Sequence, residues 1–119
     1  MAKEKPLTDD EMWKLIDDCN WAGDHDYERI RKELRAKLTK SQRKQLAEFA
    51  DSKQEYIQKV FNSAWLGEPG IEVSDDGWSD LTAEVVGRGR KFYAKITVKK
   101  LRDMVENDTY RENFMYVFN

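Results

Sequence analysis

Few side chains in this sequence could carry out acid–base catalysis. His25 is the only histidine, and it lies between Asp24 and Asp26. Histidine exchanges its proton near neutral pH, which makes it the first candidate for a general base. A turn that caps a helix accounts for the same three residues without any chemistry. We therefore expect no catalytic residue. A small enzyme that uses His25 or the pair Asp75 and Asp76 is kept as the second alternative to the function favoured below.

The pair of aspartates forms the next candidate site. Asp75 and Asp76 follow Ser74 directly. A calcium loop needs ligands at alternating positions and a closing glutamate, and this segment lacks that spacing. A serine that caps a helix accounts for the motif, because the helix dipole favours carboxylates in the first turn. We expect a structural role for these three residues and no metal site.

The segment from Gly87 to Arg90 reads Gly-Arg-Gly-Arg and resembles a phosphate-binding loop. No strand is predicted before it, so the glycine spacing is weak support for phosphate binding. A helix that ends with Gly87 or Gly89 in the left-handed conformation is the simpler explanation. Arg90 could then form a bidentate ion pair with Asp75 or Asp76 and join two helices.

Apolar residues at helical spacing predict the elements that must position these side chains. Thr8 and Glu11 are spaced as a capping box, and a threonine or serine precedes several later helices. The first predicted helix spans residues 9–20. The second is capped by Asp24 and extends to Leu38, and the third spans residues 42–66. Ser74 and Thr97 each begin a further helix.

Residues 90–98 fit two structures. Alternate apolar positions match a half-buried strand, whereas Phe92, Tyr93 and Ile96 share one face of a helix. We favour the helix because a lone strand has no partner elsewhere in the sequence. The predicted fold class is mainly α: a compact single-domain bundle of about five or six helices, with a short hairpin near residues 90–98 as the alternative.

Length and composition indicate one folded, soluble domain. The chain has 119 residues, of which 37% are charged, and its mean hydropathy is -0.88. Low hydropathy favours disorder, but the net charge is only -2 and the chain holds 4 Trp, 5 Tyr and 5 Phe. We expect residues 1–7 to form a flexible N-terminal tail and residues 8–119 to form a single helical domain.

Aromatic residues should build the core. Trp13, Trp65 and Trp78 are the expected anchors, and residues 110–118 should fold back onto them. Cys19 is the only cysteine and lies on the apolar face of the first helix, so we expect a buried, inert thiol. One cysteine and one histidine cannot form a zinc site of the usual type, and no apolar run could span a membrane. We predict a cytoplasmic protein without cofactor, metal or membrane partner.

Charge is segregated along the chain. Residues 29–59 carry 10 bases and 4 acids and residues 88–102 carry 7 bases and no acid, whereas residues 1–28 carry 3 bases and 9 acids and residues 60–87 carry 6 acids and no base. Acidic helices packed beside basic helices would explain this pattern, and so would a surface for a partner. The expected partner-binding residues are Arg88, Arg90, Lys91, Lys95, Lys99, Arg102 and Trp21, an aromatic residue in a predicted turn.

These observations favour a non-enzymatic protein-binding module. It would recognise a protein partner through its charge-segregated surface, in a toxin–immunity or regulatory setting. Nucleic-acid binding by the basic blocks 29–44 and 88–102 is the first alternative, since a basic footprint is the usual electrostatic signature of such proteins.

Short motifs across most of the chain also resemble one family. They comprise Trp13-Lys14-Leu15-Ile16, Leu38-Thr39, Ser74-Asp75-Asp76-Gly77-Trp78, Gly89-Arg90 and Tyr93. The order and spacing are similar to those of the bacterial DUF4240 family, of unknown function, and the chain resembles a divergent member because Thr82 stands where an arginine is expected. The resemblance implies a mainly helical fold, a bacterial setting and no catalytic residue. The structural motif that it implies comprises Ser74, Asp75, Asp76, Trp78, Gly89 and Arg90.

Overall fold

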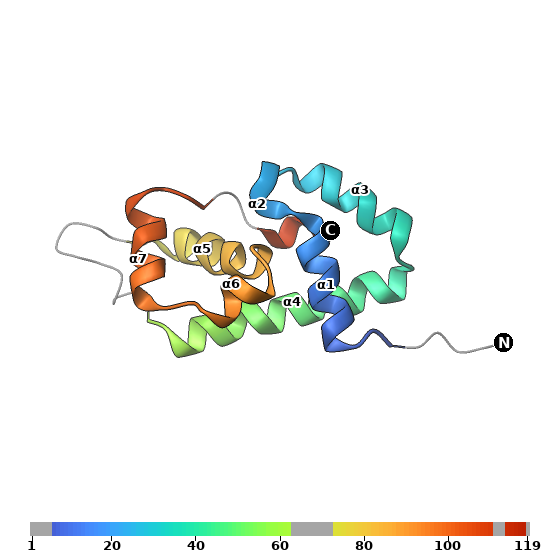
Figure 1. Cartoon of the computed structure of the whole chain (residues 1–119), viewed down its shortest axis with the longest axis horizontal. Coiled ribbons are helices and arrows are strands. Elements are labelled where there is room, and N and C mark those ends of the chain that lie inside the picture. Colours follow the sequence, from blue (N-terminus) through green and yellow to red (C-terminus); the bar gives the residue numbers. More distant parts are fainter. Residues whose placement is uncertain (1–5, 63–72, 111–113, 119) are drawn as a thin grey trace.

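The computed structural model describes residues 6–62, 73–110 and 114–118. Within these ranges the chain forms helices and no strand, and none of the helices is long and apolar enough to cross a bilayer. The elements are α1 (Asp9–Cys19), α2 (Trp21–Asp24), α3 (Tyr27–Lys37), α4 (Lys40–Val60), α5 (Asp75–Gly87), α6 (Arg90–Ala94), α7 (Val98–Glu106) and the 3₁₀ helix η2 (Phe114–Phe118) (Figure 1). The predicted mainly α bundle is confirmed.

Side-chain caps fix where the long helices begin. Thr8 accepts a hydrogen bond from the Glu11 N–H, and the Glu11 carboxylate accepts one from the Thr8 N–H, which completes the expected capping box. Thr39 forms a second capping box with the third residue of α4. Because of this cap, α4 begins at Lys40 and not at residue 42.

Three further predicted boundaries differ from the structure. The expected turn at residues 20–23 is largely the short helix α2. Asp26 caps α3 by accepting the N–H of the third helical residue at 3.1 Å, so the prediction that Asp24 is the cap is wrong. The helix α4 ends at Val60, before the predicted end at residue 66, and the last part of that prediction lies outside the described residues.

The hairpin alternative for residues 90–98 is wrong. Arg90–Ala94 form α6, and α7 follows after Thr97, whose hydroxyl accepts the Lys100 N–H at 3.2 Å. Both helices place apolar side chains against α5 and the end of α4. A strand at this place would leave its backbone groups without a partner, whereas helices satisfy them internally.

The core has two clusters of buried side chains, and α5 contributes to both. The first cluster lies among α1, α2, α3, α4 and η2, and it includes Ala83 and Val86 of α5. The second lies among α4, α5 and α7, and it includes Leu81 and Val85. Every residue from Leu81 to Gly87 is buried, so α5 is the central helix of the bundle. Any polar side chain in that stretch must find its partners inside the protein.

The predicted anchors of the core can be placed in these clusters. Trp13 is buried in the first cluster, and the half-buried Trp78 packs against the second. Trp65 lies outside the described residues. Residues 114–118 fold back onto the core as expected, with Phe114 fully buried in the first cluster.

Leu7, the last residue of the predicted N-terminal tail, is fixed to α4. Its N–H donates to the side-chain oxygen of Gln45 at 3.0 Å, and its carbonyl accepts from the Gln45 amide at 2.9 Å. The Leu7 side chain is half-buried against the first cluster. The chain is therefore anchored one residue before the capping box of α1.

Candidate functional site

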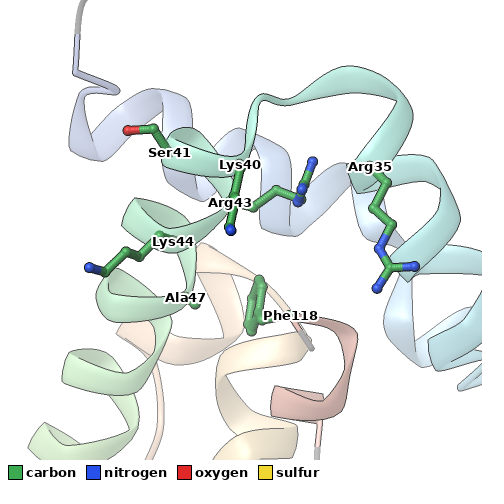
Figure 2. Close-up of a pocket in the computed structure, with 7 residues that line it drawn as sticks. All are labelled: Arg35, Lys40, Ser41, Arg43, Lys44, Ala47 and Phe118. Carbon is green, nitrogen blue, oxygen red and sulfur yellow. The ribbon is translucent and has the colours of Figure 1, made fainter.

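A cationic pocket lies where α3, α4 and η2 meet. It has a volume of about 750 Å³. Its lining consists of Arg35 from α3, Lys40, Ser41, Arg43, Lys44 and Ala47 from α4, and Phe118 from η2 (Figure 2). We call it the basic pocket. The lining contains four cationic side chains and no acidic one, so its electrostatic potential favours an anionic ligand.

The connection between α3 and α4 holds the cations in place. Thr39 caps α4, so Lys40 occupies the first position of that helix. Arg43 donates from Nη1 to the backbone carbonyl of Leu38 at 2.9 Å, which fixes its guanidinium beside the connection. Lys44 is exposed and extends from the outer side of α4 (Figure 2). The pocket thus combines two exposed lysines with an arginine that is held by a backbone hydrogen bond.

Phe118 and Ala47 give the basic pocket an apolar floor. Figure 2 shows the Phe118 ring between α4 and the cationic side chain of α3. The ring packs edge-to-face on the buried Phe114, with centroids 5.5 Å apart. Arg31 donates to the Tyr116 carbonyl at 2.9 Å and ties η2 to α3. The floor is therefore supported from the core and from the neighbouring helix.

A neighbouring hollow of about 460 Å³ has a lining of mixed charge. The two cavities share Arg35, but Asp26 and Glu28 from the beginning of α3 also line the second one. Arg29, another of its lining residues, forms two ion pairs of its own, at 2.7 and 3.0 Å. Arg31 and Lys32 also line this hollow, so cations continue along α3, but there they are mixed with carboxylates.

The second basic block lies at the other end of the molecule. Figure 1 places α7 and the connection between α3 and α4 at opposite ends. Four of the expected partner-binding residues are exposed on this block: Lys91 on α6, Lys95 directly after it, and Lys99 and Arg102 on α7. The two basic blocks of the sequence therefore form two separate surfaces and not one continuous patch.

The prediction that Arg90 pairs with Asp75 or Asp76 is wrong. Its Nη1 lies 2.6 Å from the Asp10 carboxylate of α1, and its backbone N–H donates to Asp17 at 3.0 Å. Asp75 and Asp76 lie at the beginning of α5, whereas Arg90 follows its end. The 13-residue helix, about 20 Å long, therefore separates Arg90 from both acids. Arg90 therefore joins α6 to α1.

The Ser74 motif and Gly89 have structural roles. Ser74 accepts the Gly77 N–H at 3.1 Å, which confirms the predicted cap, and Asp75 and Asp76 are exposed in the first turn. Gly89 has a φ of 100°, as expected for a glycine after a helix. The backbone N–H that follows it binds the protein's own carboxylate, at Asp17, where a phosphate loop would bind phosphate.

The expectation that Trp21 is an exposed contact residue is wrong, because its side chain is only 1% exposed. The helix α2 directs the indole into the core, where its ring packs on Phe114 with centroids 5.4 Å apart. The indole N–H donates to Glu84 Oε1 at 2.9 Å. Trp21 therefore stabilises the interior and cannot contact a partner.

Glu84 is the most deeply buried acid among the described residues. Its side chain is fully buried in α5, and its second oxygen accepts from Arg88 Nε at 3.0 Å and lies 3.2 Å from His25 Nε2. Arg88 in turn donates to the Thr109 carbonyl, in the segment that follows α7. Through these contacts the carboxylate joins α2, α5 and the C-terminal segment. We call the side chains of Trp21, His25, Glu84 and Arg88 the Glu84 cluster.

The Glu84 cluster gives His25 a carboxylate partner but no substrate site. A hollow of about 350 Å³ lies beside the cluster, and its lining includes Trp21 and Arg88 but neither Glu84 nor His25. Among the described residues, the side chain hydrogen-bonded to His25 is Glu84 and not a nucleophile. The arrangement resembles a buried structural network more than an acid–base pair facing a substrate.

Comparison with known proteins bears on the motifs described above. The chain matches the family described as "Protein of unknown function (DUF4240)" over residues 7–117. It belongs to the DUF4240 family. No curated protein and no solved structure matches the chain. The resemblance drawn from the short motifs is therefore confirmed, and the family description assigns no activity to this DUF4240 chain.

Sequence reasoning missed two parts of the site in this DUF4240 protein. The convergence of Phe118 with the basic block of α3 and α4 depends on how η2 folds back, for which the local sequence gives no signal. Glu84 did carry a signal, because it is the single acid between the apolar residues Leu81 and Val86. A charged residue in such a stretch indicates a buried polar partner.

Cys19 is buried as expected, and its thiol donates to the Leu15 carbonyl at 3.1 Å. Burial, with a smaller contribution from Glu33, raises the pKa of Cys19 from 9.0 to about 12. The unfolded chain thus loses this proton at a lower pH than the native protein does. The resulting contribution to stability is complete below pH 9.0 and is lost as the pH rises toward about 12.

Cys19 should therefore resist alkylation in the native protein. At about pH 8.5, iodoacetamide should label it at least tenfold more slowly in buffer than in concentrated urea, because only the thiolate reacts. Mass spectrometry of timed samples measures both rates. Equal rates in the two solutions would contradict the buried position.

Proposed function

We propose that this protein is a non-enzymatic binding module that recognises an acidic partner protein through the basic pocket. The observation that carries the proposal is the gathering of four cations from two helices around an apolar floor, in a lining without a carboxylate. Complementary charge of this kind accelerates encounter and selects against basic partners.

The pattern of ion pairs supports the same function. Arg88 and Arg90 of the other basic block bind Glu84 and Asp10, so these two charges are complemented within the protein. Lys40 and Lys44 are exposed and form no ion pair with any residue in the described ranges. The lysines of the basic pocket can therefore pair with acids of another molecule.

We place this activity in the bacterial cytoplasm, in an immunity or regulatory accessory protein. A protein that must capture a toxin or a regulator benefits from rapid association, and opposite charge raises association rates to about 10⁸–10⁹ M⁻¹s⁻¹ at low salt. The helical scaffold presents three of the four cations from α4, whose start is fixed by a capping box. Such a scaffold loses little conformational entropy on binding.

Charge reversal in the basic pocket is expected to abolish capture of the partner. The variant Lys40→Glu/Lys44→Glu removes two exposed cations from the pocket, and Lys95→Glu/Lys99→Glu makes the same change of charge at the other end of the molecule as the control. Each tagged protein is incubated with lysate of the native host at about 100 mM salt, where charges about 10 Å apart still interact. Circular dichroism establishes that both variants remain folded.

We expect one protein to co-purify with the wild type and with the control, in the presence or absence of nuclease, and to be lost from the pocket variant. Recovery that disappears on nuclease treatment would instead favour nucleic acid, which is the alternative ligand of the same cations. Loss of the partner protein from the control variant alone would indicate that the basic residues near α6 and α7 bind it.

A further inference from the structure

We infer that the basic pocket takes a short acidic segment of a protein that carries one apolar side chain among its carboxylates. This inference rests on the proposed function, and it specifies the chemistry of the partner. It follows from three features: the apolar floor, the placement of the cations, and the mixed charge of the neighbouring hollow.

The floor requires an apolar group. Phe118 is half-buried, with its ring supported by Phe114, and it lines the pocket together with the methyl group of Ala47. A ligand with carboxylates alone would leave this apolar surface in contact with water. A phenylalanine or leucine side chain would cover it and remove apolar area from water on both molecules.

The walls require carboxylates near that apolar residue. Arg35 comes from α3, whereas Lys40, Arg43 and Lys44 come from α4, and Figure 2 shows the Phe118 ring between the two helices. Arg43 uses one donor for the Leu38 carbonyl, and a guanidinium has five, so it retains donors for a carboxylate. Acids on both sides of the apolar residue would therefore meet cations.

The mixed charge beyond the basic pocket favours a short peptide segment over nucleic acid. Beyond Arg35, the neighbouring hollow is lined by Asp26 and Glu28 together with Arg29, Arg31 and Lys32. A nucleic acid carries a phosphate at every nucleotide, and a strand that continued past the pocket would bring phosphates to these carboxylates. A protein segment can instead place neutral or basic residues at that position.

Titration with labelled peptides tests the inference. The probes are a glutamate peptide with one central phenylalanine, the same peptide with a central alanine, and an oligothymidylate of similar charge. We expect the phenylalanine peptide to bind about tenfold more tightly than the alanine peptide, the change expected for covering an aromatic side chain. The oligothymidylate should bind more weakly than the phenylalanine peptide.

Variants locate the binding site. Lys40→Glu/Lys44→Glu should weaken both peptides, and Ala47→Glu should do so by placing a carboxylate on the floor, while glutamate keeps a good helix propensity in α4. Lys95→Glu/Lys99→Glu should bind both peptides like the wild type. Equal weakening by this control would place the binding outside the pocket and overturn both the inference and the proposed function.

The outcomes distinguish the two claims. Equal affinity for the phenylalanine and alanine peptides, with loss in the Lys40→Glu/Lys44→Glu variant, would overturn the apolar requirement and leave the acidic-partner function standing. Tighter binding of the oligothymidylate than of either peptide would overturn both and favour nucleic acid.

Discussion

Replacing Glu84 with glutamine is expected to lower the free energy of unfolding by about 3–5 kcal/mol. The carboxylate is fully buried and interacts with Trp21, His25 and Arg88. A neutral amide removes the charge that compensates Arg88, and its NH₂ group has no lone pair for the donors that Glu84 now binds. Since a domain of this size is stable by about 5–15 kcal/mol, this loss is a large fraction of its total stability.

Urea denaturation monitored by circular dichroism measures this loss. The matched control is Glu48→Gln, the same chemical change at an exposed position of α4, which should alter the stability by less than about 0.5 kcal/mol. A loss below about 1 kcal/mol for Glu84→Gln would mean that the cluster contributes no more than one ordinary hydrogen bond.

Replacing Gly87 with alanine should lower the free energy of unfolding by about 1–3 kcal/mol. A Cβ at this position would lie 2.7 Å from Trp21 Cδ1 and 2.8 Å from Phe114 Cγ. Both are buried aromatic rings in the first cluster and cannot swing aside as an exposed side chain could. The helix α5 must therefore move away from η2 and α2, which loosens the packing of both.

Gly23→Ala is the control for this second variant. The Cβ at residue 23 would contact the side chain of Asn20, which is exposed and free to change rotamer. Its stability should remain within about 0.5 kcal/mol of the wild type in the same denaturation experiment. Equal stability of Gly87→Ala and the wild type would contradict the close approach of α5 to the two rings.

Much of the helical architecture could be predicted from local sequence, because caps and apolar periodicity act over a few residues. Thr8, Ser74 and Thr97 all cap the helices that they were expected to begin. Contacts between distant segments could not be predicted in this way. The hydrogen bond from Trp21 to Glu84 joins residues 63 positions apart, and a tryptophan in a predicted turn gave no indication of burial.

The candidate site, too, could be predicted only in part. The basic blocks were visible as sums of charge, and such sums do not distinguish an arginine bound inside the protein from a lysine that faces solvent. Arg88 contacts a buried acid, whereas Lys44 is exposed at the rim of the basic pocket. Phe118 completes the pocket from the far end of the chain, and only the folded structure brings it to α4.

The most direct test of the central claim is to map the binding site by nuclear magnetic resonance. A ¹⁵N-labelled sample is titrated with the glutamate peptide that carries one phenylalanine, and amide shifts are followed for each residue. We expect the largest shifts at residues 35–47 and 114–118, around the basic pocket. Shifts confined to residues 90–102, or no shifts at all, would contradict it.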